Sequence, residues 1–510
     1  MIWKKTWFSY GVWGLYSAVV SMAFALGIML FVPKGSNPYL AVLLVCLFFL
    51  LMTLFFFLSQ TIVVNVGGKR KIKRKAAVLV ETFAILAALA GGSVLSVGFL
   101  RQAQPETLLQ SEYLAGSFVG GPLTVSESVY GARVFYPYVL RALFIFVGNH
   151  GVAALWLQLF LFLAGSFLLY RGVRRLSGKA AGVFVFAVLM TVPLWVGTKE
   201  TIAPLWLEFF LFGMGFYLTA VFLGKHRDLE FAGERGKGRK FFDCIRPVLL
   251  GLFTAFVIYA GPFGILLTAL GLSVLWSLPE GGKTRTYPSR LLLAFLLLAG
   301  IAGGLFLLCL VEACVCKETL FQVAETKWQL YGAQVGLHFP LTFTDRESVA
   351  FSVLAGGMFW GIFRFFFEPM EDSLSGMFFF FLAAAGVRTA GLFTPDEKEI
   401  WLLLVMAVCG AVCIGRSLTP FNVSKPEKTA ENPGYEEKKE AAKEETAGEQ
   451  RIIKEKAPQP QKKQEMQDKP ERAEKPAVKY LDNPLPGPKK HVPKTMDYDI
   501  TISDDDDFDF

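Results

Sequence analysis

The chain has 510 residues, a formal net charge of +8 and seven cysteines, and 53% of its residues are hydrophobic. With a mean hydropathy of +0.45, this composition excludes an ordinary soluble protein and indicates that lipid surrounds most of the chain. Stretches such as 40–58 and 291–310 are apolar on every side and, at about 1.5 Å of rise per residue, long enough to cross a bilayer. The sequence therefore predicts an all-α polytopic membrane protein with about twelve transmembrane helices.

In chain order, the predicted spans lie near residues 7–32, 39–58, 76–99, 151–170, 180–197, 204–223, 247–260, 262–278, 291–312, 348–366, 377–393 and 400–415. The first is too long for the core of a signal peptide and lacks a small-residue cleavage site. The stretch 247–278 is interrupted at Ala260-Gly261-Pro262, where proline disfavours a continuous helix. We expect two short helices there, because a single helix would reverse the topology of everything downstream.

Orientation follows from the distribution of Lys and Arg, since short cytoplasmic loops collect them. Four basic segments alternate with poorly basic ones: 59–75, 171–179, 224–246 and 279–290. We therefore expect a multi-pass protein of the cell membrane with both termini in the cytoplasm. The two long outer segments are then 100–150 and 314–347.

Four parts follow from this pattern: an N-terminal hairpin and basic loop (1–75), a transmembrane core (76–310), a C-terminal transmembrane segment (311–416) and a tail (417–510). Residues 424–510 hold 17 basic and 21 acidic residues and almost no large apolar ones. Such a segment cannot bury a core, so a disordered charged cytoplasmic tail is expected. Its end, from Tyr480 to Phe510, combines prolines, a basic cluster and an aromatic-acidic terminus, which fits either a motif for a cytoplasmic partner or a solubilising tail.

Outside the tail, the excess of Lys and Arg falls in the cytoplasmic loops, where it is attracted to anionic lipid headgroups. We therefore expect no nucleic-acid partner. The cysteines mostly lie in apolar runs, where cysteine behaves as a small hydrophobe. Cys314 and Cys316 border an outer segment, but the only further ligand type near them is the distant His338. We expect neither a metal nor another cofactor.

The outer segment 100–150 contains a run, 134–147, that is apolar with sparse charge but only about 14 residues long. This length fits a helix lying in the outer interface better than a helix crossing the membrane. A loop of this size in a compact membrane protein is usually functional.

Three segments here resemble the GT-C superfamily of glycosyltransferases that use lipid-linked sugars, in particular the bacterial relatives of protein mannosyltransferases (glycosyltransferase family 39). They are Ser111-Glu112-Tyr113-Leu114-Ala115, Phe135-Tyr136-Pro137-Tyr138 up to Gly148, and the span ending Arg174-Arg175-Leu176-Ser177-Gly178. Thr198-Lys199-Glu200-Thr201 takes the place of an outer turn, and the likeness covers roughly 76–310. The tail segment Asn483–His491 is similar to the terminus of many Gram-positive clostridial membrane proteins of this class.

The resemblance implies transfer of a sugar from a polyprenyl phosphate to an acceptor on the outer face of the membrane. A carboxylate would take the proton of the acceptor hydroxyl, and cations would stabilise the departing phosphate. Glu112 is the implied base, with Glu106 and Glu200 as second choices. For the phosphate, arginine is preferred because its planar fork binds two oxygens, and the candidates are Arg133, Arg141 and Arg388.

Charges inside predicted spans need partners, because an unpaired charge in lipid is costly. For Arg388 the alternatives are phosphate binding, snorkelling to the interface, or pairing with Glu312 or Asp396. Glu81 lies one turn from the basic loop, which favours a salt bridge to Lys75 over a functional role. Glu208 is equally compatible with a helix–helix hydrogen bond and with a site.

Two departures weaken the implied activity. In the first loop Glu112 stands alone where many relatives have two acidic residues close together, and a lysine that often precedes the proline at 262 is missing. A non-catalytic scaffold with a degenerate core therefore stays open. So does a twelve-helix secondary transporter, although the long first outer loop and the absence of a visible internal repeat disfavour it.

Overall fold

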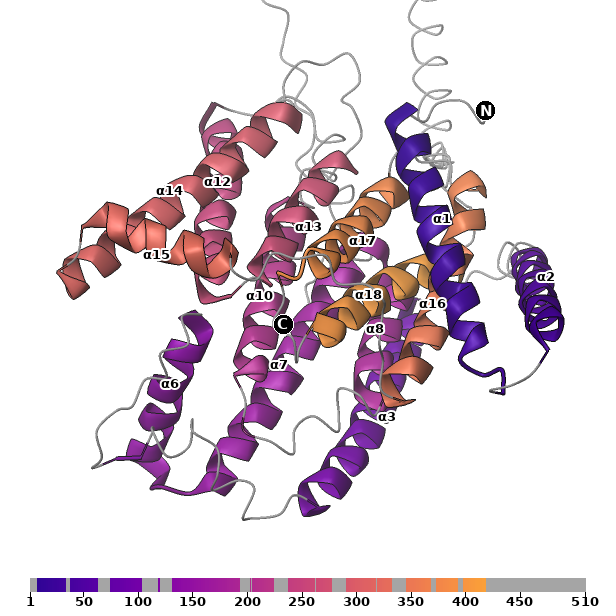
Figure 1. Ribbon diagram of the computed structural model, residues 1–510, viewed down its shortest axis with the longest axis horizontal. Helices are drawn as coiled ribbons and strands as arrows, with labels where there is room; N and C mark the ends of the chain where they lie inside the picture. The colour runs from indigo at the N-terminus through magenta and orange to yellow at the C-terminus, as the bar shows by residue number, and fades with distance from the viewer. Residues whose placement is uncertain are drawn as a thin grey trace, which may run out of the picture. The chain divides into compact units, whose positions relative to one another are not determined.

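The computed structural model describes residues 7–33, 37–62, 74–102, 118–119, 131–192, 202, 204–223, 237–261, 263–277, 290–317, 319–332, 345–367, 373–392 and 398–418. Within these ranges every regular element is an α-helix, as Figure 1 shows. The predicted tail, 417–510, lies outside the described residues except for its first two positions. All described residues belong to one compact unit of the chain.

In chain order the helices are α1 (Trp7–Met29), α2 (Pro38–Ile62), α3 (Arg74–Gln102), α6 (Gly131–Val147), α7 (Gly151–Ser177), α8 (Lys179–Thr191), α10 (Leu205–Phe222), α12 (Lys237–Ala260), α13 (Gly264–Trp276), α14 (Arg290–Cys316), α15 (Leu320–Gly332), α16 (Asp345–Phe367), α17 (Ser373–Thr389) and α18 (Lys398–Leu418).

Each predicted span coincides with one of these helices. Seven helices are long and apolar enough to cross a membrane: α1, α2, α3, α7, α10, α14 and α16. The apolar parts of α8, α12, α13, α17 and α18 are shorter, at 10 to 17 residues. The all-α prediction is therefore confirmed for the described residues, and the seven long apolar helices fit a membrane protein. The run 134–147 also forms a helix, α6, and α15 is an additional helix that the sequence analysis did not predict.

Two junctions explain how adjacent spans separate. Gly178, with φ of 92°, is the only residue between α7 and α8, and this left-handed φ is readily adopted by glycine alone. The break at Gly261 divides the stretch 247–278 into α12 and α13, as predicted. The chain folds back sharply there: a Cβ on Gly264 would lie only 2.4 Å from the backbone nitrogen of Ile258, so glycine is needed at this position.

Neighbouring contacts fix the direction of the helices. Glu81 of α3 lies beside Lys179 of α8, and a Cβ on Gly92 would lie 3.0 Å from Met190, so α3 and α8 run parallel. At one end of the bundle, α3, α8 and α17 end and α7, α10, α13 and α18 begin. We call this end the Arg388 end. The opposite end, where α3 and α8 begin, is the Glu81 end.

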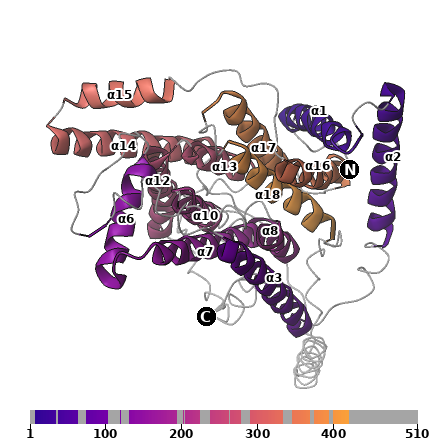
Figure 2. The ribbon, with the colours of Figure 1, turned by 60° about the horizontal axis from the view of Figure 1, so that its bottom comes forward.

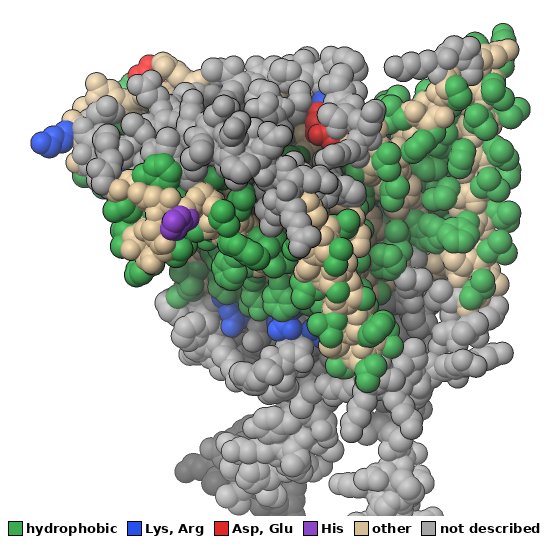
Figure 3. Space-filling view, turned by 90° about the horizontal axis from the view of Figure 1, so that it is seen from below, with side chains coloured by type: hydrophobic (Ala, Val, Ile, Leu, Met, Phe, Trp, Pro, Cys, Tyr) green, Lys and Arg blue, Asp and Glu red, His purple; other side chains and the backbone are tan. Residues whose placement is uncertain are grey.

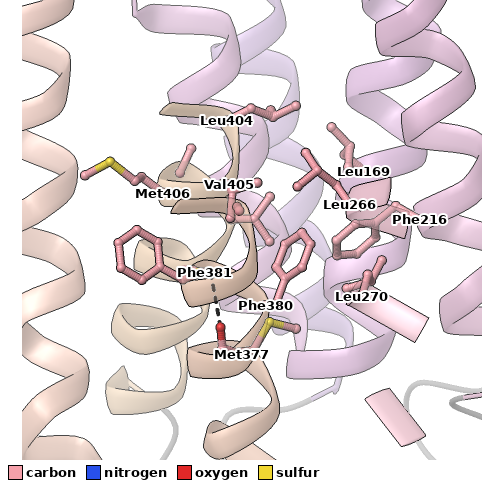
Figure 4. Packing of buried hydrophobic residues seen from close by; sticks show 14 of the residues in the cluster. Leu169, Phe216, Leu266, Leu270, Met377, Phe380, Phe381, Leu404, Val405 and Met406 are labelled. Atoms are coloured by element: carbon pink, nitrogen blue, oxygen red, sulfur yellow. Dashed lines mark hydrogen bonds between the residues drawn. The ribbon is translucent and has the colours of Figure 1, made fainter. Parts of the chain in front are cut away.

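Helix α18 forms the centre of the core, with every residue from 401 to 413 buried. It packs against α16, α8, α17 and α7. Figure 4 shows Phe380 of α17 pointing toward Phe216 and Leu266 of α10 and α13, whereas Phe381 points the other way and contacts Tyr16 of α1. The thiol of Cys409 donates to the Met377 carbonyl at 3.6 Å, which ties α18 to α17.

Small residues bring two helix pairs into close contact. Where α12 crosses α14, a Cβ on Gly300 would lie 2.6 Å from the Val248 carbonyl oxygen and 3.2 Å from the Cα of Gly251. Where α7 crosses α10, a Cβ on Gly213 would lie 2.6 Å from the Gly165 carbonyl oxygen. Membrane helices associate through such close backbone contacts, because lipid gives no hydrophobic drive between them.

Hydrophobic side chains cover most of the described part of the face in Figure 3. Helix α2 illustrates the pattern, since only Phe56 and Gln60 are fully buried and its other side chains are exposed or half-buried. Gln60 accepts a hydrogen bond of 3.2 Å from the buried Arg364 of α16, which anchors one end of α2. An apolar surface of this extent fits lipid rather than water.

Candidate functional site

A buried ion pair occupies the Arg388 end. Arg388, in the last turn of α17, is 1% exposed, and Glu399, in the first turn of α18, is 6% exposed. Nη2 of Arg388 lies 2.5 Å from Oε1 of Glu399, and Nε donates to Oε2 at 3.4 Å. The guanidinium fork thus meets both carboxylate oxygens, which is the strong geometry for this pair.

A second buried carboxylate lies at the same end. Glu208 is in the first turn of α10 and is 4% exposed. Its Oε1 would lie 3.8 Å from a Cβ on Gly261, so the carboxylate faces the junction between α12 and α13. A negative charge is favourable there, because the free amides at the beginning of a helix carry a partial positive charge.

An aromatic stack connects these two charged positions. The ring of Trp401, two residues after Glu399, stacks on the ring of Phe263 with centroids 5.0 Å apart. Trp401 also contacts Phe212 of α10 edge-on, at 5.5 Å. Residues from α10, α13 and α18 are therefore held together beside the ion pair.

Trp206 adds a polar atom to this region. Its ring is 1% exposed and contacts Phe162 of α7 edge-on, at 5.2 Å. Its Nε1 finds no hydrogen-bond acceptor among the described residues. A buried indole nitrogen normally donates a hydrogen bond, so this atom is a free donor close to Glu208 in the sequence.

Helix α6 is attached to the Arg388 end through a small core of its own. Tyr136, Leu140 and Phe144 pack with residues at the beginning of α7 and with Ile202. Nε2 of Gln158 on α7 donates to the Tyr136 hydroxyl at 3.1 Å, with both side chains buried. Pro137 lies inside α6 without ending it.

The structure describes only some of the candidate site residues that the sequence suggested. Glu106, Glu112 and Glu200 lie outside the described residues. Arg133 is in α6, but its side chain is not described. Arg141 is half-buried on α6. Arg388 is thus the candidate that the structure places in a buried charged cluster.

The sequence analysis missed the partner of Arg388. It named Glu312 and Asp396, whereas the carboxylate that takes the guanidinium fork is Glu399. Asp396 lies outside the described residues. Glu399 could have been found from the sequence, because it is the acidic residue at the start of the last predicted span, three positions after Asp396.

A second charged cluster lies at the Glu81 end. The Glu81 carboxylate accepts a hydrogen bond of 2.6 Å from the Tyr170 hydroxyl and pairs with Nε of Arg174 at 3.1 Å. Lys179 Nζ approaches its other oxygen at 3.9 Å. The predicted partner, Lys75, has no described side chain. The partners that the structure shows come from α7 and α8, so this cluster joins three helices.

Metal ligands do not gather in the described part of the chain: no three His, Cys, Asp or Glu side chains lie close enough there to hold an ion. The described cysteines are free thiols, with Cys409 and Cys413 buried in the core.

No model of a known protein family, no curated protein and no solved structure matches this chain. Its function is therefore inferred from the residues themselves and from the resemblance of their motifs.

Proposed function

We propose that this protein is a membrane glycosyltransferase that moves a sugar from a polyprenyl phosphate to an acceptor at the outer face of the cell membrane. In this proposal about twelve helices cross the bilayer, both termini are cytoplasmic, and the Arg388 end faces outward. The alternation of basic and poorly basic segments supports this orientation.

The observation that carries the proposal is the buried ion pair of Arg388 with Glu399. An arginine that is almost fully buried in a membrane bundle is costly and marks a functional position by default. The carboxylate of Glu208 and the stack of Trp401 on Phe263 belong to the same end of the bundle.

The candidate base lies in a segment that joins the bundle at this same end. Residues 103–130, which include Glu106 and Glu112, connect the end of α3 to α6, and residues 193–201, which include Glu200, connect the end of α8 to α10. Chain connectivity therefore links all three candidate bases to the end that holds Arg388.

In the proposed reaction the acceptor oxygen forms a bond to the anomeric carbon of the sugar, and the bond from that carbon to the phosphate oxygen breaks. Glu112 takes the proton of the acceptor hydroxyl. The polyprenyl phosphate leaves with an additional negative charge, which arginine side chains stabilise. Arg388 is the preferred candidate for this role, with Arg133 and Arg141 of α6 as further candidates.

A secondary transporter is the second candidate, because one observation favours it. Glu208 faces a break between two helices, and breaks of this kind often line the binding sites of transporters. The non-catalytic scaffold, whose tail would bind a cytoplasmic partner, predicts neither activity.

The deciding experiment supplies radiolabelled polyprenyl-phosphate sugars to the purified protein in detergent and measures transfer to added acceptors. Glu112→Gln and Arg388→Lys are compared with the wild type, and donor binding is measured separately. Transfer that is lost in Glu112→Gln while donor binding persists would support the enzyme and its base. If the wild type transfers no sugar from any donor, uptake by proteoliposomes would separate the transporter from the scaffold.

A further inference from the structure

Helix α15 carries two large exposed aromatic side chains on one side. Phe321 is 77% exposed and Trp328 is 80% exposed. They are seven residues apart, and two helical turns bring positions i and i+7 onto the same face. Ala324, which lies between them on this face, is also exposed.

The same helix has a separate polar side. At about 100° per residue, Gln322, Thr326 and Gln329 fall together on a side that lies about 80–140° around the helix from Phe321, and Glu325 lies between this side and the aromatic pair. These side chains are hydrogen-bonded locally: Thr319 and Gln322 form a capping box, and Gln329 donates to Glu325 at 3.2 Å. A polar side satisfied in this way is suited to water.

A third direction of α15 faces the protein. Val323 is 2% exposed, and α15 runs beside α14 (Figure 2). The apolar side chains of α15 therefore face two directions: Val323 packs against the bundle, and Phe321 and Trp328 point away from it.

The neighbouring span shows what covers the aromatic pair. Helix α14 is long and apolar enough to cross a membrane, and only residues 317–319 separate it from α15. Lys317, with φ of 58°, turns the chain directly after α14. Near this end α14 itself exposes Phe306, Leu307, Leu310 and Val311, so an apolar surface continues from the span to α15.

We propose that α15 is an interfacial helix that inserts Phe321 and Trp328 into the lipid leaflet at the Cys316 end of α14. The polar side, with Thr326 and Gln329, then faces water. Tryptophan is enriched in this zone, because its ring is apolar and its N–H reaches the headgroups. The inference does not depend on the glycosyltransferase proposal, since it concerns only how the segment after α14 meets lipid.

The test uses the full chain in liposomes of phosphatidylethanolamine and phosphatidylglycerol. The photo-reactive residue p-benzoylphenylalanine replaces Phe321 or Trp328 and, as matched controls on the polar side, Thr326 or Gln329. After irradiation, mass spectrometry counts lipid adducts on the peptide that contains α15. We expect adducts at 321 and 328 to exceed those at 326 and 329 severalfold.

Three results would overturn the proposal. Equal lipid adducts at all four positions would mean that α15 has no water-facing side. Adducts to a second copy of the protein at 321 and 328 would mean that a protein covers the aromatic pair. An absence of lipid adducts at both positions, in variants that keep the melting temperature of the wild type, would mean that the helix lies away from the membrane.

Discussion

The guanidinium of Arg388 meets both carboxylate oxygens of Glu399, although the two residues belong to different helices and are almost fully buried. Residues 390–397 connect these helices, so the ion pair joins the end of α17 to the beginning of α18. The pair neutralises a charge that would otherwise be very costly in this position.

Breaking the Arg388 pair should strongly destabilise the protein. We expect Glu399→Gln to lower the free energy of unfolding by about 3–5 kcal/mol, because the guanidinium loses its counter-charge while it stays buried. Unfolding by SDS titration measures the effect. The double variant Arg388→Met, Glu399→Leu is the control, and it should recover most of the loss. Equal stability of Glu399→Gln and wild type would show that the pair contributes nothing.

The Glu81 cluster should respond in two distinct steps. Tyr170→Phe removes one hydrogen bond to a charged group and should cost about 1.5–3 kcal/mol. Glu81→Gln removes the counter-charge of Arg174 and should cost more, about 3–5 kcal/mol. The same unfolding measurement ranks them. The reverse order would mean that the hydroxyl, not the ion pair, holds α3 against α7.

The crossing of α12 and α14 should be sensitive to a single methyl group. Gly300→Ala would bring its Cβ to 2.6 Å from the Val248 carbonyl oxygen, so we expect a loss of about 1–3 kcal/mol. Gly303→Ala on the same helix is the matched control, because a Cβ there meets nothing within 4 Å. It should be neutral or slightly stabilising, since alanine favours helix more than glycine does. Similar losses in both variants would contradict the close crossing.

The proposed orientation can be checked with the native cysteines. Cys314 is an exposed free thiol near the end of α14, and Cys244 is a half-buried thiol within α12. A membrane-impermeant maleimide should label intact cells, and the variant Cys314→Ser, Cys316→Ser should abolish that label. Cys244 should react only after permeabilisation. Labelling of intact cells that survives in the double variant and disappears in Cys244→Ser would reverse the orientation.

The sequence by itself determined which segments are helices, because an apolar run and its Gly or Pro breaks are local properties of the chain. It predicted the break at Gly261, the helix α6 and all twelve apolar helices, although the structure describes only seven as long enough to cross a membrane. It did not predict α15, because this helix alternates polar and apolar residues over only 13 positions and lacks a long apolar run.

Only the tertiary structure decided which residues meet. The partners of Glu81 on α7 are 89 and 93 positions away along the chain and the one on α8 is 98 positions away, while the sequence offered the nearby Lys75. The carboxylate of Glu399 reaches Arg388 because α17 and α18 pack together at that end. Helix formation depends on neighbours within a few residues, whereas the pairing of buried charges depends on how whole helices pack, and no local pattern encodes that packing.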